Sequence, residues 1–316
     1  MAATSVARPR TSRSRFSGLG WRRARWGYVF IAPWLIGFLA FTAFPMIATF
    51  IFTFTNVNLS QADPLKFVGL DNYAKLLADQ QVWDALTVTL KYMALALPVA
   101  VALPLIFALM LHSYHLKGSG FFRVLFFLPY VIPFVAGVLV WGGMLNPDTG
   151  WLNLALKSLG IEHPPAWLDD PTWIYSGLVM MGIWGIGAGM IVYLAGLKGI
   201  PSDLYEAARI DGAGAWASLR HITIPMLSPV IFYTLVLAVV EVLQYFLVPL
   251  VLKNGTGEPG GSTMFYNLYL YKTFFTFQNM SYGATMAWLL FGITLLITLA
   301  LFGSARRWVF YAGEAR

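Results

Sequence analysis

The stretch EAARIDGAGAWASLRHITIPMLSP, residues 206–229, is a polar segment between two long apolar runs. Ser202, just ahead of it, is a suitable N-cap for a new helix, and small and apolar residues then recur at helical spacing. Gly212 ends this helix. A second short helical stretch, at about 215–221, leads to Pro225, where we expect the chain to turn back into apolar sequence. The segment is therefore predicted to be a compact pair of short helices.

The rest of the chain has the composition of a membrane protein. Of its 316 residues, 58% are hydrophobic and 11% are charged, whereas an ordinary globular domain carries about 25% charged residues. It contains no cysteine, so a disulfide framework or a thiolate metal site is excluded. We predict an all-α membrane protein with six transmembrane helices, at about 27–54, 84–111, 121–145, 172–196, 227–252 and 283–303.

Basic residues set the expected orientation. Seven of the 21 Lys and Arg residues lie in the first 26 positions, just ahead of an apolar run. Fifteen lie on the side of the membrane that holds both termini and five on the other side. This bias predicts that both termini are cytoplasmic in a multi-pass protein of the bacterial inner membrane. The net charge of +7 is then explained by the anionic lipid bilayer, without a nucleic-acid partner.

The same pattern predicts four parts along the chain. A basic cytoplasmic tail, 1–26, precedes the first transmembrane helix, 27–54. A core domain, 84–303, holds five further transmembrane helices and the polar loop, 197–226, and a cytoplasmic tail, 304–316, ends the chain. A helical loop with small residues on one face suits docking into a groove on another protein. A local cap over its own bundle is the alternative that composition leaves open.

The spacing within the loop carries a family resemblance. Glu206, Ala207 and Ala208 are followed after three residues by Gly212 and then, after nine more, by an Ile-x-x-Pro sequence that starts at Ile222. This pattern resembles the EAA loop of bacterial ABC-importer permeases, with Ile224 in place of the usual Leu. The stretches 67–79, 123–141 and 146–153 are similar to carbohydrate-importer permeases of the maltose and glycerol-phosphate type.

The resemblance implies a type I ABC-importer permease bundle whose loop is a cytoplasmic coupling helix. It implies two separate ATPase subunits, which bind ATP and Mg, an extracytoplasmic solute-binding protein, and a second, similar permease in a heterodimer. The chain itself would hold no cofactor, catalyse no reaction and translocate a carbohydrate, meaning a sugar, oligosaccharide or polyol derivative. The residues that it implies for ATPase coupling are Glu206, Ala207, Ala208, Asp211, Gly212, Ala213, Ile222 and Pro225.

Glu241 stands twelve residues beyond Pro229, about 18 Å along an α-helix and near the middle of the fifth predicted span. Ionisable groups at that depth face protein or a water-filled cavity. Gln244 and Tyr245 follow one turn later, so these three side chains are a candidate substrate pathway. A buried Glu241 bonded to a neighbouring helix is equally consistent with the pattern. An alternative function is an ion-coupled secondary transporter in which Glu241 carries the proton or ion.

Two further motifs do not support other chemistry. GTGEPGGS, residues 255–262, has phosphate-loop glycine spacing but carries Gly261 where a phosphate loop needs lysine. His112 and His115 are three residues apart, but no third ligand accompanies them. We therefore expect no catalytic residue and no metal site in this chain.

Overall fold

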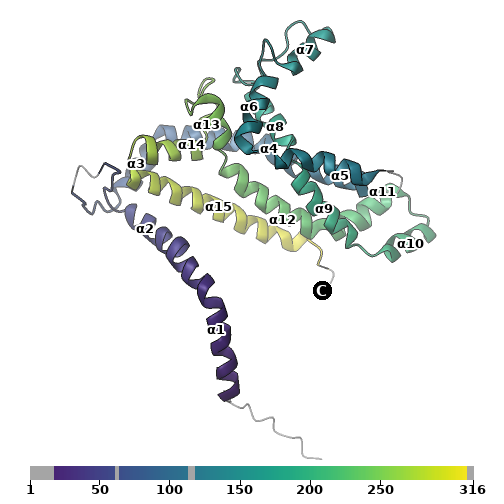
Figure 1. The fold of residues 1–316 in the computed structure, drawn as a ribbon, viewed down its shortest axis with the longest axis horizontal. Helices are drawn as coiled ribbons and strands as arrows, with labels where there is room; N and C mark the ends of the chain where they lie inside the picture. Colours follow the sequence, from purple (N-terminus) through teal and green to yellow (C-terminus); the bar gives the residue numbers. More distant parts are fainter. Residues whose placement is uncertain (1–17, 61–63, 113–117, 312–316) are drawn as a thin grey trace, which may run out of the picture. The chain divides into compact units, whose positions relative to one another are not determined.

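The computed structural model describes residues 18–60, 64–112 and 118–311, and its regular structure is helical (Figure 1). The only β pairing in these ranges is an isolated antiparallel bridge between Thr55 and Phe67. The chain forms two compact units, residues 1–52 and 53–316. The prediction of an all-α protein is confirmed, while residues 1–17 and 312–316 of the two expected tails lie outside the described ranges.

The first unit is a single helical run. It consists of α1 (Gly18–Phe38), the π-helical turn η1 (Leu39–Ala43) and α2 (Phe44–Phe52). The run Arg25–Phe52 is long and apolar enough to cross a membrane, and no part of its most apolar stretch is buried by protein. Lipid is the solvent that such a surface requires, because apolar area exposed to water is unfavourable.

The second unit contains the remaining helices. In chain order they are α3 (Asp71–Ala78), α4 (Gln80–His112), α5 (Ser119–Phe127), η2 (Leu128–Val131), α6 (Phe134–Met144), α7 (Trp151–Ser158), α8 (Ile174–Ile183), α9 (Gly187–Lys198), α10 (Ser202–Ile210), α11 (Ala215–Ser218), η3 (Leu219–Thr223), α12 (Ile224–Leu243), α13 (Leu247–Lys253), α14 (Tyr266–Tyr271), η4 (Lys272–Thr276) and α15 (Met280–Trp308).

Across the described residues, four helices are long and apolar enough to span a membrane, and the number rises to six if each of two bent pairs is one span. The pairs are Ser119–Val131 with Phe134–Met144, bent by 100°, and Ile174–Ile183 with Gly187–Lys198, bent by 54°. The first bend has a local cause. Ile132 is extended, at ψ 132°, because the ring of Pro133 disfavours helical backbone in the preceding residue.

The fifth span begins earlier than predicted. We expected a separate short helix at 215–221, but α11, η3 and α12 form one run that starts at Ala215. Proline does not stop this run. Pro229 cannot donate to the carbonyl oxygen of Pro225, and the hydroxyl of Ser228 donates to that oxygen instead, at 2.7 Å.

The same span is interrupted near its other end. The backbone leaves the helix at Gln244–Phe246 and becomes helical again in α13. Continuous apolar sequence had predicted one helix over 227–252, since hydropathy does not report such a break. Non-helical backbone at membrane depth is tolerated where it lines a cavity.

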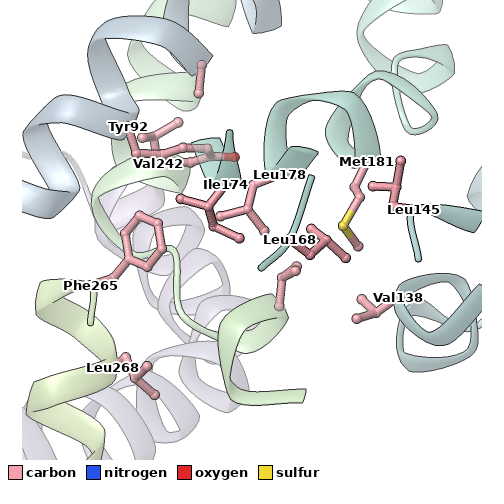
Figure 2. Packing of buried hydrophobic residues seen from close by; sticks show 12 residues of the cluster. Tyr92, Val138, Leu145, Leu168, Ile174, Leu178, Met181, Val242, Phe265 and Leu268 are labelled. Atoms are coloured by element: carbon pink, nitrogen blue, oxygen red, sulfur yellow. The ribbon is translucent and has the colours of Figure 1, made fainter. Parts of the chain in front are cut away.

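Helix α4 lies at the centre of the second unit and packs against α8, α9, α12 and α14. The ring of Tyr92 on α4 is part of a buried cluster that also contains Ile174, Leu178 and Phe265 (Figure 2). Helix α15 packs against α12 and also against α3. The core therefore holds α4, α8, α9 and α12 around a common interior.

Candidate functional site

The segment 202–223 is built by its motif residues. Helix α10 ends in a tight turn in which the amide of Ala213 donates to the carbonyl oxygen of Ala208 at 2.8 Å. Gly212 takes a positive φ of 77°, which is strained for residues with a Cβ atom. The N-cap is Pro201 and not Ser202, whose hydroxyl contacts Asp203 within the first helical turn, so our N-cap prediction was wrong.

This segment is fixed to the bundle by packing. Tyr205 and Ile222 pack against a buried cluster that includes Leu197 and Leu227. A Cβ atom added to Gly196 would lie 2.7 Å from a Leu227 methyl group, so α9 and the start of α12 approach closely there. Figure 1 shows α10 projecting beside α9 and α11 at one end of the bundle.

Two bulky apolar side chains of the segment are more than 70% exposed, well above Leu204 at 41%. Ile210 is 87% exposed and Trp216 is 72% exposed. The sequence analysis missed both residues, although a large apolar residue within a polar loop is a detectable signal. Of the predicted coupling residues, Glu206, Ala207, Asp211 and Gly212 are exposed, and the half-buried ones are Ala208, Ala213, Ile222 and Pro225.

A cavity of about 530 Å³ lies between α4, α9 and α12. Tyr92, Glu241 and Tyr245 all line it. The rings of Tyr92 and Tyr245 stack with centroids 4.8 Å apart. Glu241 is exposed to this space, so it is not the buried carboxylate of our alternative interpretation. Two helices that are distant in sequence thus bring a carboxylate and aromatic rings to one site.

Gln244 does not join this group. It is the first residue beyond α12, and its carbonyl oxygen accepts a hydrogen bond from the Asn267 side chain at 2.8 Å. The lining instead includes two further tyrosines that sequence analysis did not select, Tyr130 and Tyr233. Tyrosine within an apolar span is the signal that could have identified them, because its hydroxyl needs a polar partner.

Polar contacts also join loops and helix ends within the second unit. A single carboxylate oxygen of Asp79 accepts hydrogen bonds from Tyr269, at 3.0 Å, and from Tyr282, at 2.7 Å. Burial and the hydrogen bond to the Asp79 carboxylate raise the pKa of the Tyr269 hydroxyl to about 12. Lys253 forms an ion pair with Asp169, which joins the loop before α8 to the end of α13.

The glycine-rich stretch 255–262 is a connecting loop between α13 and α14. The amide of Gly260, one of those that a phosphate loop would direct at its ligand, donates to the carboxylate of Glu258 at 2.8 Å. His112 ends α4, and His115 lies outside the described residues.

A bundle of apolar helices around a cavity with polar groups, carrying a projecting helical segment, defines a transport subunit of the membrane. Residues 77–309 match the family described as "Binding-protein-dependent transport system inner membrane component", and the chain belongs to this family. It is thus a multi-pass permease subunit of an ABC transporter and not an enzyme. The predicted family and the predicted type I permease fold are confirmed.

Individual relatives cover nearly the whole chain. The "Probable ABC transporter permease protein YesP" of Bacillus subtilis (strain 168) is 37% identical over 91% of this chain and 93% of its own length. The "Lactose transport system permease protein LacF" of Rhizobium radiobacter is 33% identical, with 89% and 94% covered. A solved bacterial ABC transporter involved in the import of the acidic polysaccharide alginate contains a chain with 26% identity and a TM-score of 0.74, over 90% of this chain and 96% of that one.

Proposed function

We propose that this permease imports a carbohydrate and that the cavity between α4, α9 and α12 is part of its path. The observation that carries this proposal is the grouping of Glu241 with Tyr92 and Tyr245 around a space of about 530 Å³. Aromatic faces stack on the apolar faces of sugar rings, and a carboxylate accepts hydrogen bonds from sugar hydroxyls. Lactose and alginate, the cargoes named for two relatives, are both carbohydrates.

The helix break at Gln244–Phe246 supports the same location. Discontinuous transmembrane helices form substrate sites in many transporters, because their ends offer polar backbone groups at membrane depth. Glu241 lies in the last turn of α12, immediately before the break. Gln244, which also belongs to the predicted pathway, lies in this break, and its side chain does not line the cavity.

The partner proposal follows from the segment 202–223. Two ATPase subunits bind ATP and Mg, and a groove on one of them receives this segment, with Ile210 and Trp216 as apolar anchors. Glu206, Ala207, Ala208, Asp211, Gly212 and Ala213 form the helix and turn that present those anchors, and Ile222 and Pro225 join it to the fifth span. Nucleotide-driven closure of the ATPases moves this segment and switches the bundle between inward-facing and outward-facing states.

The other partners complete an importer. A solute-binding protein outside the cell delivers cargo to the outer loops, as the family description implies. A second, similar permease forms a heterodimer with this chain. An apolar cavity of about 490 Å³ beside the α5–α6 bend, lined by Phe126, Leu128 and Trp184 among others, supports a protein neighbour there. Both termini lie in the cytoplasm, as the excess of Lys and Arg on that side supports.

Uptake into vesicles tests this function against ion coupling. The complete transporter, reconstituted with its ATPases and binding protein, should take up labelled sugar only when ATP is supplied. Uptake should persist when an ionophore collapses the proton gradient. Uptake that needs the gradient and no ATPase would contradict the proposal and favour Glu241 as an ion carrier.

Gly212→Trp tests the coupling segment separately. A bulky side chain at a backbone φ of 77° should distort the turn and impair both ATPase association and uptake. If Gly212→Trp retains both ATPase association and uptake, the segment does not couple the permease to the ATPases. Gly118→Trp is a matched control, since Gly118 also has a positive φ, of 82°, and open space around it.

A further inference from the structure

The cavity between α4, α9 and α12 has a single charged side chain in its lining. That side chain is Glu241, and the described lining residues include no lysine, arginine or histidine. The other polar side chains are hydroxyls, which belong to Tyr92, Tyr130, Tyr233, Tyr245 and Thr234. The remaining lining residues are apolar or glycine, so Glu241 determines the sign of the charge that this chain contributes to the space.

Within residues 18–60, 64–112 and 118–311, no Lys, Arg or His side chain forms an ion pair with this carboxylate. The ion pair found among the described residues joins Lys253 to Asp169, and Glu241 takes part in none. The backbone adds charge of the same sign. Helix α12 ends at Leu243, and the C-terminal end of a helix carries a partial negative charge. Glu241 lies within that last turn, so the side chain and the helix end act together.

We propose that this cavity selects cargo by charge: it accepts neutral and amino-bearing sugars and disfavours sugars that carry a carboxylate or sulfonate. This inference rests on the proposed carbohydrate function and narrows its substrate class. Repulsion between like charges is stronger beside protein walls than in bulk water, because the effective dielectric constant there is lower. An ammonium group, in contrast, gains an ionic partner in Glu241 and aromatic faces in Tyr92 and Tyr245.

Binding to the purified complex of the two permeases and two ATPases tests the selection directly. The solute-binding protein is left out because it binds sugars itself. The probes are the β-1,4-linked dimers of glucose, glucosamine and glucuronate, which have similar shapes and different charges. We expect the glucuronate dimer to bind at least about tenfold more weakly than the glucose dimer, as measured by titration calorimetry. The glucosamine dimer should bind at least as tightly as the glucose dimer.

Variants at one position then identify the cause. Glu241→Gln keeps the shape and removes the charge, so it should abolish the difference between the glucose and glucuronate dimers. Glu241→Asp keeps the charge and should preserve the difference. Glu162→Gln removes an exposed carboxylate outside the cavity and is the matched control. Gel filtration of each complex confirms assembly, and if Glu241→Gln does not assemble, the comparison of probes on the unaltered protein decides.

The outcomes separate this inference from the proposed function. Equal binding of the glucose and glucuronate dimers by the unaltered protein would overturn charge selection and leave carbohydrate import standing. A difference that survives in Glu241→Gln would overturn the role of Glu241. Failure of all three dimers to bind, together with no ATP-dependent sugar uptake, would overturn the carbohydrate function and this inference with it.

Discussion

The hydroxyl oxygen of Tyr205 lies 3.0 Å from that of Thr223, and this contact joins the two arms of the segment 202–223. The Thr223 hydroxyl donates to the carbonyl oxygen of Ser218, so Tyr205 is left to donate to Thr223. Thr223 is buried where η3 meets α12. A displacement of α10 would therefore be transmitted to the base of the fifth span.

Replacement of Tyr205 by Phe should weaken that transmission. The change removes one hydrogen bond, worth about 1 kcal/mol, and keeps the packing of the ring. We expect sugar uptake per ATP hydrolysed to fall roughly twofold to fivefold, the range that such a free energy allows. Tyr311→Phe removes the hydroxyl of a tyrosine that is 49% exposed and should leave the ratio unchanged. An unchanged ratio in Tyr205→Phe would show that this contact does not transmit the motion.

Loss of the apolar anchors should reduce ATPase association. Ile210→Ser and Trp216→Ala each remove exposed apolar area, which is worth about 1.5–3 kcal/mol when fully buried at an interface. Affinity for the ATPase subunits should fall at least about tenfold, while the melting temperature of the isolated permease stays constant. Leu159, 79% exposed beyond the end of α7, offers the matched change Leu159→Ser. If Ile210→Ser and Trp216→Ala bind the ATPase subunits as tightly as the unaltered permease and Leu159→Ser do, the anchor assignment is wrong.

The contact of Asp79 with Tyr269 should stabilise the second unit where the loop before α4 meets α14. Asp79→Asn and Tyr269→Phe are each expected to cost about 1–3 kcal/mol, because hydrogen bonds to a charged acceptor are strong. The double variant should lose less than the sum of the two, since Asp79→Asn weakens and Tyr269→Phe removes the same bond. Thermal unfolding of the unaltered protein, the two single variants and the double variant in detergent measures this double-mutant cycle. Strict additivity would show that the two side chains do not interact.

The raised pKa of Tyr269 predicts a pH dependence of stability. Its pKa of about 12 in the folded protein exceeds the ordinary value of 10, so the folded state binds more protons between these limits. Stability should be retained below pH 10 and should decrease as the pH rises from 10 to 12. The decrease should be shallower in Tyr269→Phe, which has no hydroxyl to ionise. An identical slope in both proteins would contradict this origin.

Gly187 should tolerate no side chain. A Cβ atom there would lie 2.2 Å from the carbonyl oxygen of Phe126, and backbone cannot move aside as a flexible side chain can. Gly187→Ala should therefore lower the yield of folded protein and its melting temperature. Gly292→Ala, on α15 with open space around it, should leave both unchanged or slightly raise them. A stable Gly187→Ala protein would show that α9 does not need to pack so closely.

Much of the fold could be predicted because its signals are local. Apolar length identified the membrane-spanning segments, and α10 and its turn followed from residue spacing and from Gly212. The proline bend at Ile132 also has a local cause. Helix continuity was harder to predict, since Pro225 usually argues for a helix start, whereas Ser228 and the π-helical turn η3 allow α11 to continue into α12.

The candidate site was predictable only in part. The sequence analysis selected Glu241 and Tyr245 because polar groups are costly in lipid. It also selected Gln244 from helical spacing, which fails because α12 ends at Leu243. Tyr92 was missed, since nothing local to it indicates that it stacks on Tyr245.

Local sequence patterns were therefore enough to predict the membrane environment, the short polar helix between two spans and the presence of one carboxylate in the fifth span. These properties depend on the apolar character and spacing of neighbouring residues. Helix packing was needed to learn that Glu241 lines a cavity with Tyr92, that Gln244 does not, and that Ile210 and Trp216 are exposed on this chain. The physical reason is that the packing of one helix against others, distant in sequence, decides which of its faces is buried, lines a cavity or remains exposed.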